Sequence, residues 1–284
     1  MVSRRLYGSI CLSTLLLFPV SYMTSSAEAQ SFCATKPFDN PFQQVGVQHG
    51  EGLDRILAEF QKAPPPASGE TRTRAEGLEV VRVSFEQFVS ENGATTELIE
   101  RVESAVVSLQ AAKDQVDPLA GIPSIELLSE PQRSFIRRII AAVGTNQSVE
   151  LRRQAVDREA RRALSHLGLT EASPVLLSAA VATSSMTYWE ERDQEWIAAV
   201  RRFSGAQKPG TNTAGESAIQ GGKIVKEDVK GAVAGAIAGA ITGAGAAVST
   251  LAGGLAGSAV EAIDQLWDWF FDDDDDDEEE EEED

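Results

Sequence analysis

Residues 231–260 read GAVAGAIAGAITGAGAAVSTLAGGLAGSAV, which is thirty residues without a charge. Six glycines recur there at a spacing of four: Gly231, Gly235, Gly239 and Gly243 in a first run, and Gly253 and Gly257 in a second. Residues four apart share a helix face, so these glycines form a groove that admits a second helix at backbone distance. The pattern predicts a helix-packing surface, and we expect Gly235→Leu or Gly239→Leu to weaken its association.

Charged and aromatic residues flank this stretch. Lys223, Lys226 and Lys230 precede it, and Trp267, Trp269, Phe270 and Phe271 follow it. Lysines at one end and an aromatic belt at the other are typical of a segment that meets two membrane interfaces. We therefore predict that residues 223–271 form a glycine-zipper segment that associates with a membrane or with a second copy of the chain.

A soluble arrangement of the same segment is an equal alternative. Alanine and glycine carry little apolar surface, so the stretch is only marginally hydrophobic. A thirty-residue helix would be about 45 Å long and would exceed the bilayer core. Gly243-Ala244-Gly245 offers a break between two shorter helices. In that hairpin the second arm would fill the groove of the first.

The N-terminus has the features of an export signal. Arg4 and Arg5 precede the apolar stretch 10–20, and Ser26-Ala27-Glu28-Ala29 supplies the small residues of a cleavage site. We expect residues 1–29 to be a cleaved signal peptide. The protein is then exported, and periplasmic, envelope-associated or secreted.

Few residues remain for a metal or redox site. Removal of the signal removes Cys11 and leaves Cys33 as the single cysteine beside two histidines, His49 and His166. One cysteine forms no intramolecular disulfide, and a zinc cluster is excluded by count. We predict no cofactor, no metal site and no catalytic residue, and the role of Cys33 stays open between an interchain disulfide and a buried thiol.

Charge is concentrated at the C-terminus. The net charge is -19, from 25 basic and 44 acidic residues, and residues 272–284 contribute 13 acids with no base. Such a block repels itself, so we expect a disordered, solvated tail whose deletion leaves the stability of the body unchanged. The tail would weakly bind divalent cations or basic partners, and nucleic acid is disfavoured as a partner.

Helical patterns dominate residues 30–203. Apolar residues recur at helical spacing in 97–112, 130–143, 148–167 and 174–203, with Gly168 between the last two. Ser129-Glu130-Pro131-Gln132 has the form of a capped helix start. Residues 78–88 fit a helix or a short strand. These patterns predict a mainly α fold with one helical domain.

Residues 204–222 are rich in glycine and polar residues and lack an apolar period. They are predicted to form a flexible linker. We therefore expect residues 30–204 to fold without the glycine-zipper segment.

Two motifs resemble a group of poorly characterised exported bacterial proteins. The first is Asn40-Pro41-Phe42 followed by Gly46, His49 and Gly52-Leu53, with Gly50 where that group has asparagine; the second is Ser184-Ser185 with Tyr188-Trp189. The glycine-rich end is similar too, and Gly221-Gly222 before Lys223 also resembles the processing site of bacteriocins. The first resemblance implies export and a helical domain with a glycine-rich end, and it implies no activity.

His49 is the one candidate for catalysis. Glu51 and Asp54 lie nearby in the sequence and are able to tune an imidazole, but a histidine in this setting is more often a capping or packing residue. The sequence contains no nucleophile elbow and no phosphate loop.

Together these patterns predict an exported, non-enzymatic envelope protein whose glycine-zipper segment mediates membrane association or oligomerisation. The alternatives are a membrane-permeabilising, bacteriocin-like toxin precursor and a hydrolase centred on His49.

Overall fold

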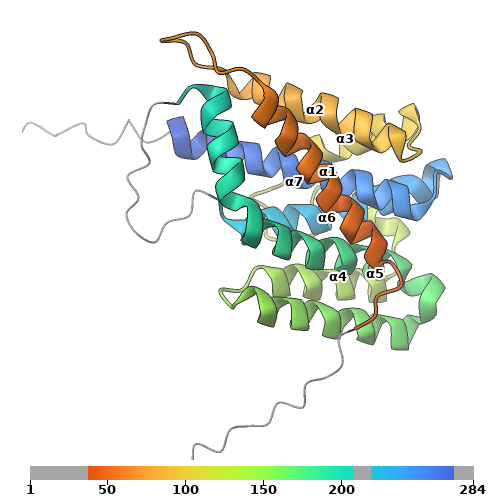
Figure 1. Cartoon of the computed structure of the whole chain (residues 1–284). Helices are drawn as coiled ribbons and strands as arrows, with labels where there is room; N and C mark the ends of the chain where they lie inside the picture. Colours follow the sequence, from red (N-terminus) through yellow and green to blue (C-terminus); the bar gives the residue numbers. More distant parts are fainter. Residues whose placement is uncertain (1–37, 207–218, 272–284) are drawn as a thin grey trace, which may run out of the picture. The chain divides into compact units, whose positions relative to one another are not determined.

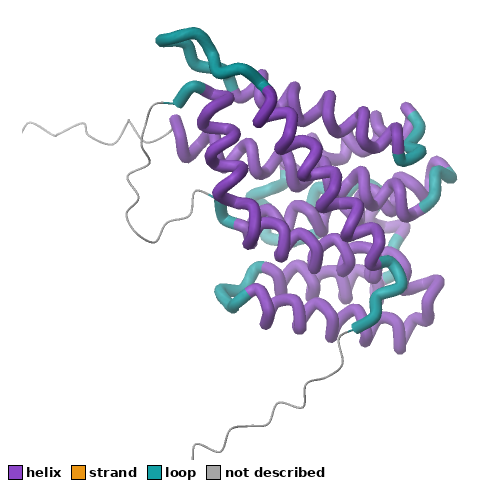
Figure 2. The backbone as a smooth tube through the Cα atoms, viewed as in Figure 1, coloured by secondary structure: helices purple, strands orange, loops and turns teal. Residues whose placement is uncertain are grey.

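The computed structural model describes residues 38–206 and 219–271. The expected signal peptide, Cys33, most of the expected linker and the acidic tail lie outside these ranges. Within them the chain forms helices and no strand, which confirms the mainly α fold (Figure 2). The elements are α1 (Gln43–Lys62), α2 (Arg74–Glu91), α3 (Thr96–Ala111), the 3-10 turn η1 (Ile125–Leu127), α4 (Glu130–Val143), α5 (Val149–Ser204), α6 (Gly221–Thr242) and α7 (Ala246–Phe271) (Figure 1).

Local sequence signals explain where several helices begin. The Ser129 hydroxyl accepts a hydrogen bond from the backbone N–H of Gln132, whose side chain accepts one from the backbone N–H of Ser129, so the predicted start of α4 is confirmed. Thr73 and Glu76 form the same reciprocal cap at α2. Residues 78–88 lie inside α2, so the strand alternative for them is wrong.

Gly168 divides α5 into two helical halves, as its position between two apolar patterns predicts. Its φ of 76° and ψ of 167° lie outside the helical region and suit glycine alone. The chain turns back at this residue, so the half before it lies beside α4 and the half after it runs beneath α1 (Figure 1).

Helices α6 and α7 lie in the core of the body, which differs from the expectation of a separate glycine-zipper segment. Helix α6 packs against α3, α4 and α5, and α7 packs against α1, α2, α3 and α5. Ile224, Val229 and Leu255 are completely buried. A helix that is apolar on every side is buried either in lipid or in a protein core, and here the amphipathic helices around it provide the core.

Candidate functional site: the glycine hairpin and the polar cluster at its base

The glycine faces of α6 and α7 pack against each other. A Cβ atom added to Gly235 would lie 1.9 Å from the carbonyl oxygen of Ser249, and one added to Gly231 would lie 2.2 Å from that of Gly253. Gly239 meets the Ser249 side chain in the same way, and Gly257 meets the Glu227 carbonyl at 2.7 Å. The helices therefore touch at backbone distance, as the small-xxx-small pattern predicts.

Gly243 belongs to the hairpin turn instead of the packing face. It ends α6 with a φ of 72°, and its N–H donates to the Gly239 carbonyl at 2.9 Å. No atom lies within 4 Å of a Cβ added there. A spacing of four fits both a helix-packing glycine and a C-terminal capping glycine. The prediction that Gly243 lines the groove therefore does not match the structure, in which it caps α6.

The flanking residues do not form two opposite belts. Because α6 and α7 are antiparallel, the lysines before the stretch and the aromatics after it lie at the same end of the hairpin. Lys223 is exposed and Lys226 is half-buried, whereas Lys230 is buried and pairs with Glu227 at 2.7 Å. Trp267 and Phe270 are buried, Trp269 is half-buried, and only Phe271 among the aromatics is exposed.

A buried polar cluster joins the base of the hairpin to α1 and α5. It consists of His49 in α1, Ser185 and Trp189 in α5, Asp228 in α6 and Ser258 in α7. The His49 Nε2 atom lies 3.9 Å from Oδ2 of Asp228, and both side chains are completely buried. The Ser185 hydroxyl donates to Asp228, and the Trp189 indole N–H donates to the Ser258 hydroxyl at 3.2 Å. Four helices therefore meet around one carboxyl group.

Burial controls the protonation of this pair. Burial lowers the pKa of His49 to about 4, and the nearby Gly254 backbone opposes this shift. Neither ring nitrogen forms a hydrogen bond with a described residue. Burial also raises the pKa of Asp228 well above its ordinary value, and the hydroxyls of Ser185 and Ser258 oppose that shift. Both shifts favour the uncharged forms because a buried charge lacks solvation. At neutral pH the His49 imidazole is therefore uncharged, and burial favours the protonated form of the Asp228 carboxyl.

The protonation of Asp228 gives a testable pH dependence. Its raised pKa means that the folded state binds a proton that the unfolded state releases above about pH 4. The stabilisation is present below that pH and is lost as pH rises through the folded-state pKa, by about 1.4 kcal/mol per pH unit. Relative to Asp228→Asn, the wild type is therefore expected to lose stability on going from pH 5 to pH 8 in urea titrations.

Asp117 provides the matched control for this titration. Its exposed carboxylate accepts hydrogen bonds from the backbone N–H of Leu119 and from Arg137, and these lower its pKa. Relative to Asp117→Asn, the wild type is therefore expected to lose stability as pH falls. Parallel pH curves for wild type and Asp228→Asn would show that Asp228 is ionised in the folded protein.

The motifs at Asn40 and Ser184 meet where α1 crosses α5. The Asn40 side-chain amide donates to the Leu176 carbonyl at 2.8 Å, and the Ser184 hydroxyl donates to the Gly46 carbonyl at 2.6 Å. A Cβ atom on Gly46 would lie 2.5 Å from the Ala180 carbonyl oxygen. The two motifs therefore bring α1 and α5 together and position His49 and Ser185 at the buried cluster.

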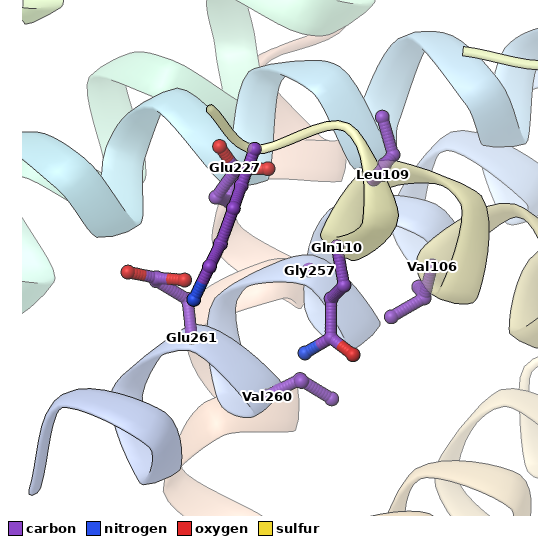
Figure 3. A pocket seen from close by; sticks show the side chains of 8 residues that line it. Val106, Leu109, Gln110, Glu227, Gly257, Val260 and Glu261 are labelled. Atoms are coloured by element: carbon purple, nitrogen blue, oxygen red, sulfur yellow. The ribbon is translucent and has the colours of Figure 1, made fainter. Parts of the chain in front are cut away.

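Two surface hollows lie beside the hairpin. The first is bordered by Glu227, Glu261 and Gln110 together with apolar residues of α3 and α7 (Figure 3). Burial raises the pKa of Glu261, against a hydrogen bond from Gln265. The second, of about 190 Å³, is lined by Arg152, Met186 and Trp189 with the start of α6. His49 borders neither hollow, and the described residues contain no group of three or more His, Cys, Asp or Glu side chains placed to hold a metal ion.

Several of these residues were not predicted from the sequence. No motif in the sequence pointed to Asp228 or Ser258. The available signal was the position of Asp228 one turn before Gly231, where the thirty uncharged residues begin. The Nδ1–H group of His166 donates to the Arg162 carbonyl at 2.8 Å, close to Gly168.

Comparison with family models, with curated proteins and with solved structures finds no match to this chain.

Proposed function

We propose that this chain is an exported, non-enzymatic envelope protein that associates with a membrane through the turn of the α6–α7 hairpin. The supporting observation is that the glycine faces of α6 and α7 pack against each other. This leaves the turn as the accessible part of the uncharged stretch. Residues 240–247 carry no charge, and most of them are exposed, including Ile241 at 47%. An uncharged turn enters the lipid interface without desolvating a charge.

The lengths of the arms favour shallow insertion. From Gly231 to Thr242 the uncharged part of α6 has twelve residues, which span about 18 Å. The bilayer core is about 30 Å thick. Helix α7 is long and apolar enough to cross a membrane, but most of its apolar stretch is buried in the body. The hairpin in this form reaches the interface without spanning the bilayer, which favours association over permeabilisation.

The position of His49 supports a non-enzymatic role. Its side chain is completely buried, neither ring nitrogen has a hydrogen-bond partner among the described residues, and it borders neither of the two hollows beside the hairpin. A general base must come within hydrogen-bond distance of a bound substrate. The buried imidazole is better explained as a packing residue at the junction of four helices.

Vesicle co-sedimentation tests the membrane proposal. Ile241→Asp is expected to reduce binding to phosphatidylethanolamine–phosphatidylglycerol vesicles by about tenfold or more, because it removes an apolar contact and adds a charge. Val107→Asp is the matched control: Val107 is 67% exposed on α3, and its replacement is expected to leave binding unchanged. Equal loss in both variants, or no binding by the wild type, would contradict the proposal.

The same samples separate the alternatives. Release of an entrapped dye at protein concentrations that only saturate binding would favour the permeabilising toxin. Sedimentation equilibrium without lipid tests oligomerisation. A dimer that survives Ile241→Asp would assign association to another surface of the chain.

A further inference from the structure

Arginines gather around the end of α7, where the acidic tail begins. The Arg201 guanidinium lies 5.7 Å from the centre of the Trp269 ring and 5.6 Å from that of Phe270. Arg74 pairs with Asp264 and approaches Asp268 at 4.0 Å. Figure 1 shows the ends of α5 and α7 and the loop before α2 on the same side of the hairpin. We name Arg72, Arg74 and Arg201 the arginine cluster.

A series of aromatic ring contacts connects Arg72 to this end of α7. Its guanidinium lies 4.3 Å above the Phe203 ring. The centre of that ring is 6.3 Å from the centre of Trp267, which is 6.0 Å from that of Phe271. Phe271 is the last described residue, and Asp272 follows it directly.

Two of the three arginines form no ion pair within 4.0 Å with a described acidic residue, although the charge of Arg72 helps to lower the pKa of Glu76. Arg74 is engaged by the carboxylates of α7, but Arg72 and Arg201 form no ion pair with a described Asp or Glu. The Arg72 side chain donates to the Pro64 carbonyl at 2.8 Å. The Nε atom of Arg201 is buried without a hydrogen-bond partner among the described residues. A buried guanidinium N–H without an acceptor is unfavourable, so this position favours a carboxylate.

We propose that residues 272–284 dock on the arginine cluster, so that the basic partner of the acidic tail is the chain's own body. Thirteen consecutive acids begin one residue after Phe271, and the first of them need no long connection to reach Arg201 beside Phe270. Arginine binds carboxylates through two parallel N–H donors, which suits a run of acidic side chains. This docking replaces the expectation that the tail makes no contact with the body, and it is independent of membrane binding.

A double-mutant cycle on the full chain tests this docking. In the first variant the tail is neutralised by replacing residues 272–284 with the corresponding Asn and Gln. At low salt its midpoint of thermal unfolding is expected to fall by about 2–4 °C, the shift that a modest electrostatic loss produces in a domain of this size. The second variant is Arg201→Gln, and the third combines the two changes.

Non-additivity is the expected result of the cycle. Once the tail is neutral, Arg201→Gln removes only the ring contacts of Arg201 and lowers the unfolding midpoint less than it does in the wild type. The midpoint losses of the two single variants therefore sum to more than the loss of the combined variant. Arg201→Lys retains most of the coupling, and 0.5 M NaCl reduces it because salt screens exposed charges. Arg153→Gln is the control, since Arg153 lies on α5 beside Glu150 at 4.0 Å, and it is expected to show no coupling. Strict additivity for Arg201, or coupling equal to that of Arg153, would overturn the proposal.

Discussion

A chain that ends after Gly205 is expected to lose cooperative folding. The truncation removes α6 and α7, which contribute large buried side chains to the shared core: Ile224, Val225, Val229, Val233, Ile237, Leu251, Leu255, Ile263, Leu266, Trp267 and Phe270. Burying each such side chain contributes about 1.5–3 kcal/mol. Together they contribute on the order of 20 kcal/mol, which exceeds the net stability of an ordinary domain.

The contacts of the remaining helices show where the damage falls. Gly52 of α1 lies against the Leu255 side chain, and Gly77 of α2 lies against Trp267 and Ile263. These glycines leave room for the hairpin, so its loss exposes the parts of α1 and α2 that pack against α7. We expect weak helical circular dichroism, a broad thermal transition and binding of a hydrophobic dye.

Complementation provides the control for the truncation. Co-expression of residues 30–206 with residues 219–271 is expected to restore a cooperative transition, because the two pieces rebuild one core. A cooperative melt of the truncated chain alone would instead support the separate helical domain that the linker composition predicts.

Gly235→Leu is expected to have the second largest effect, and to act on folding more than on association. A single Cβ there already falls 1.9 Å from the Ser249 carbonyl oxygen, so α6 and α7 must separate to admit it. Separation breaks the packing along the whole hairpin. Ordinary overpacking lowers the free energy of unfolding by about 1–3 kcal/mol. We expect a larger loss here because the clash is with backbone atoms, which cannot rotate away. Urea unfolding monitored by circular dichroism measures the loss.

Gly50→Ala is the matched control for a glycine inside a helix. A Cβ at Gly50 would lie 3.8 Å from Tyr188 Cδ2 and 3.9 Å from Ser184 Oγ, which are ordinary contacts. Alanine is favoured over glycine in a helix by about 1 kcal/mol, so this variant is expected to be as stable as the wild type or more so. If Gly235→Leu unfolds at the same urea concentration as Gly50→Ala, the close approach of the two helices is not needed for the fold.

Several helices were predictable because their signals are local. The cap at Ser129 involves residues three apart, and the break at Gly168 depends on the conformational freedom of glycine itself. The strand alternative at 78–88 was open because Val81, Val83 and Phe85 alternate, although Leu78, Val81, Phe85 and Phe88 fit a helical face. The capping box at Thr73, upstream of that window, favours the helix that the structure contains.

The candidate site was predictable only in part. The glycine spacing indicated close packing on the faces of Gly231, Gly235 and Gly253, and the structure places α6 against α7 there. Asp228 and Ser258 belong to the site through contacts with α1 and α5, and those contacts join residues far apart in the sequence. No local pattern distinguishes a buried aspartate from a solvated one.

The sequence by itself determined the helical class and the uncharged character of residues 231–260, and it offered Gly243-Ala244-Gly245 as the break of a hairpin. These follow from hydrogen bonding, backbone freedom and side-chain chemistry within a few residues. Only the tertiary structure decided that the hairpin lies in a protein core. Lipid and a surrounding layer of amphipathic helices are both able to bury the same uncharged surface. The contacts of Gly52 with Leu255 and of Gly77 with Trp267 show that α1 and α2 are part of that layer here.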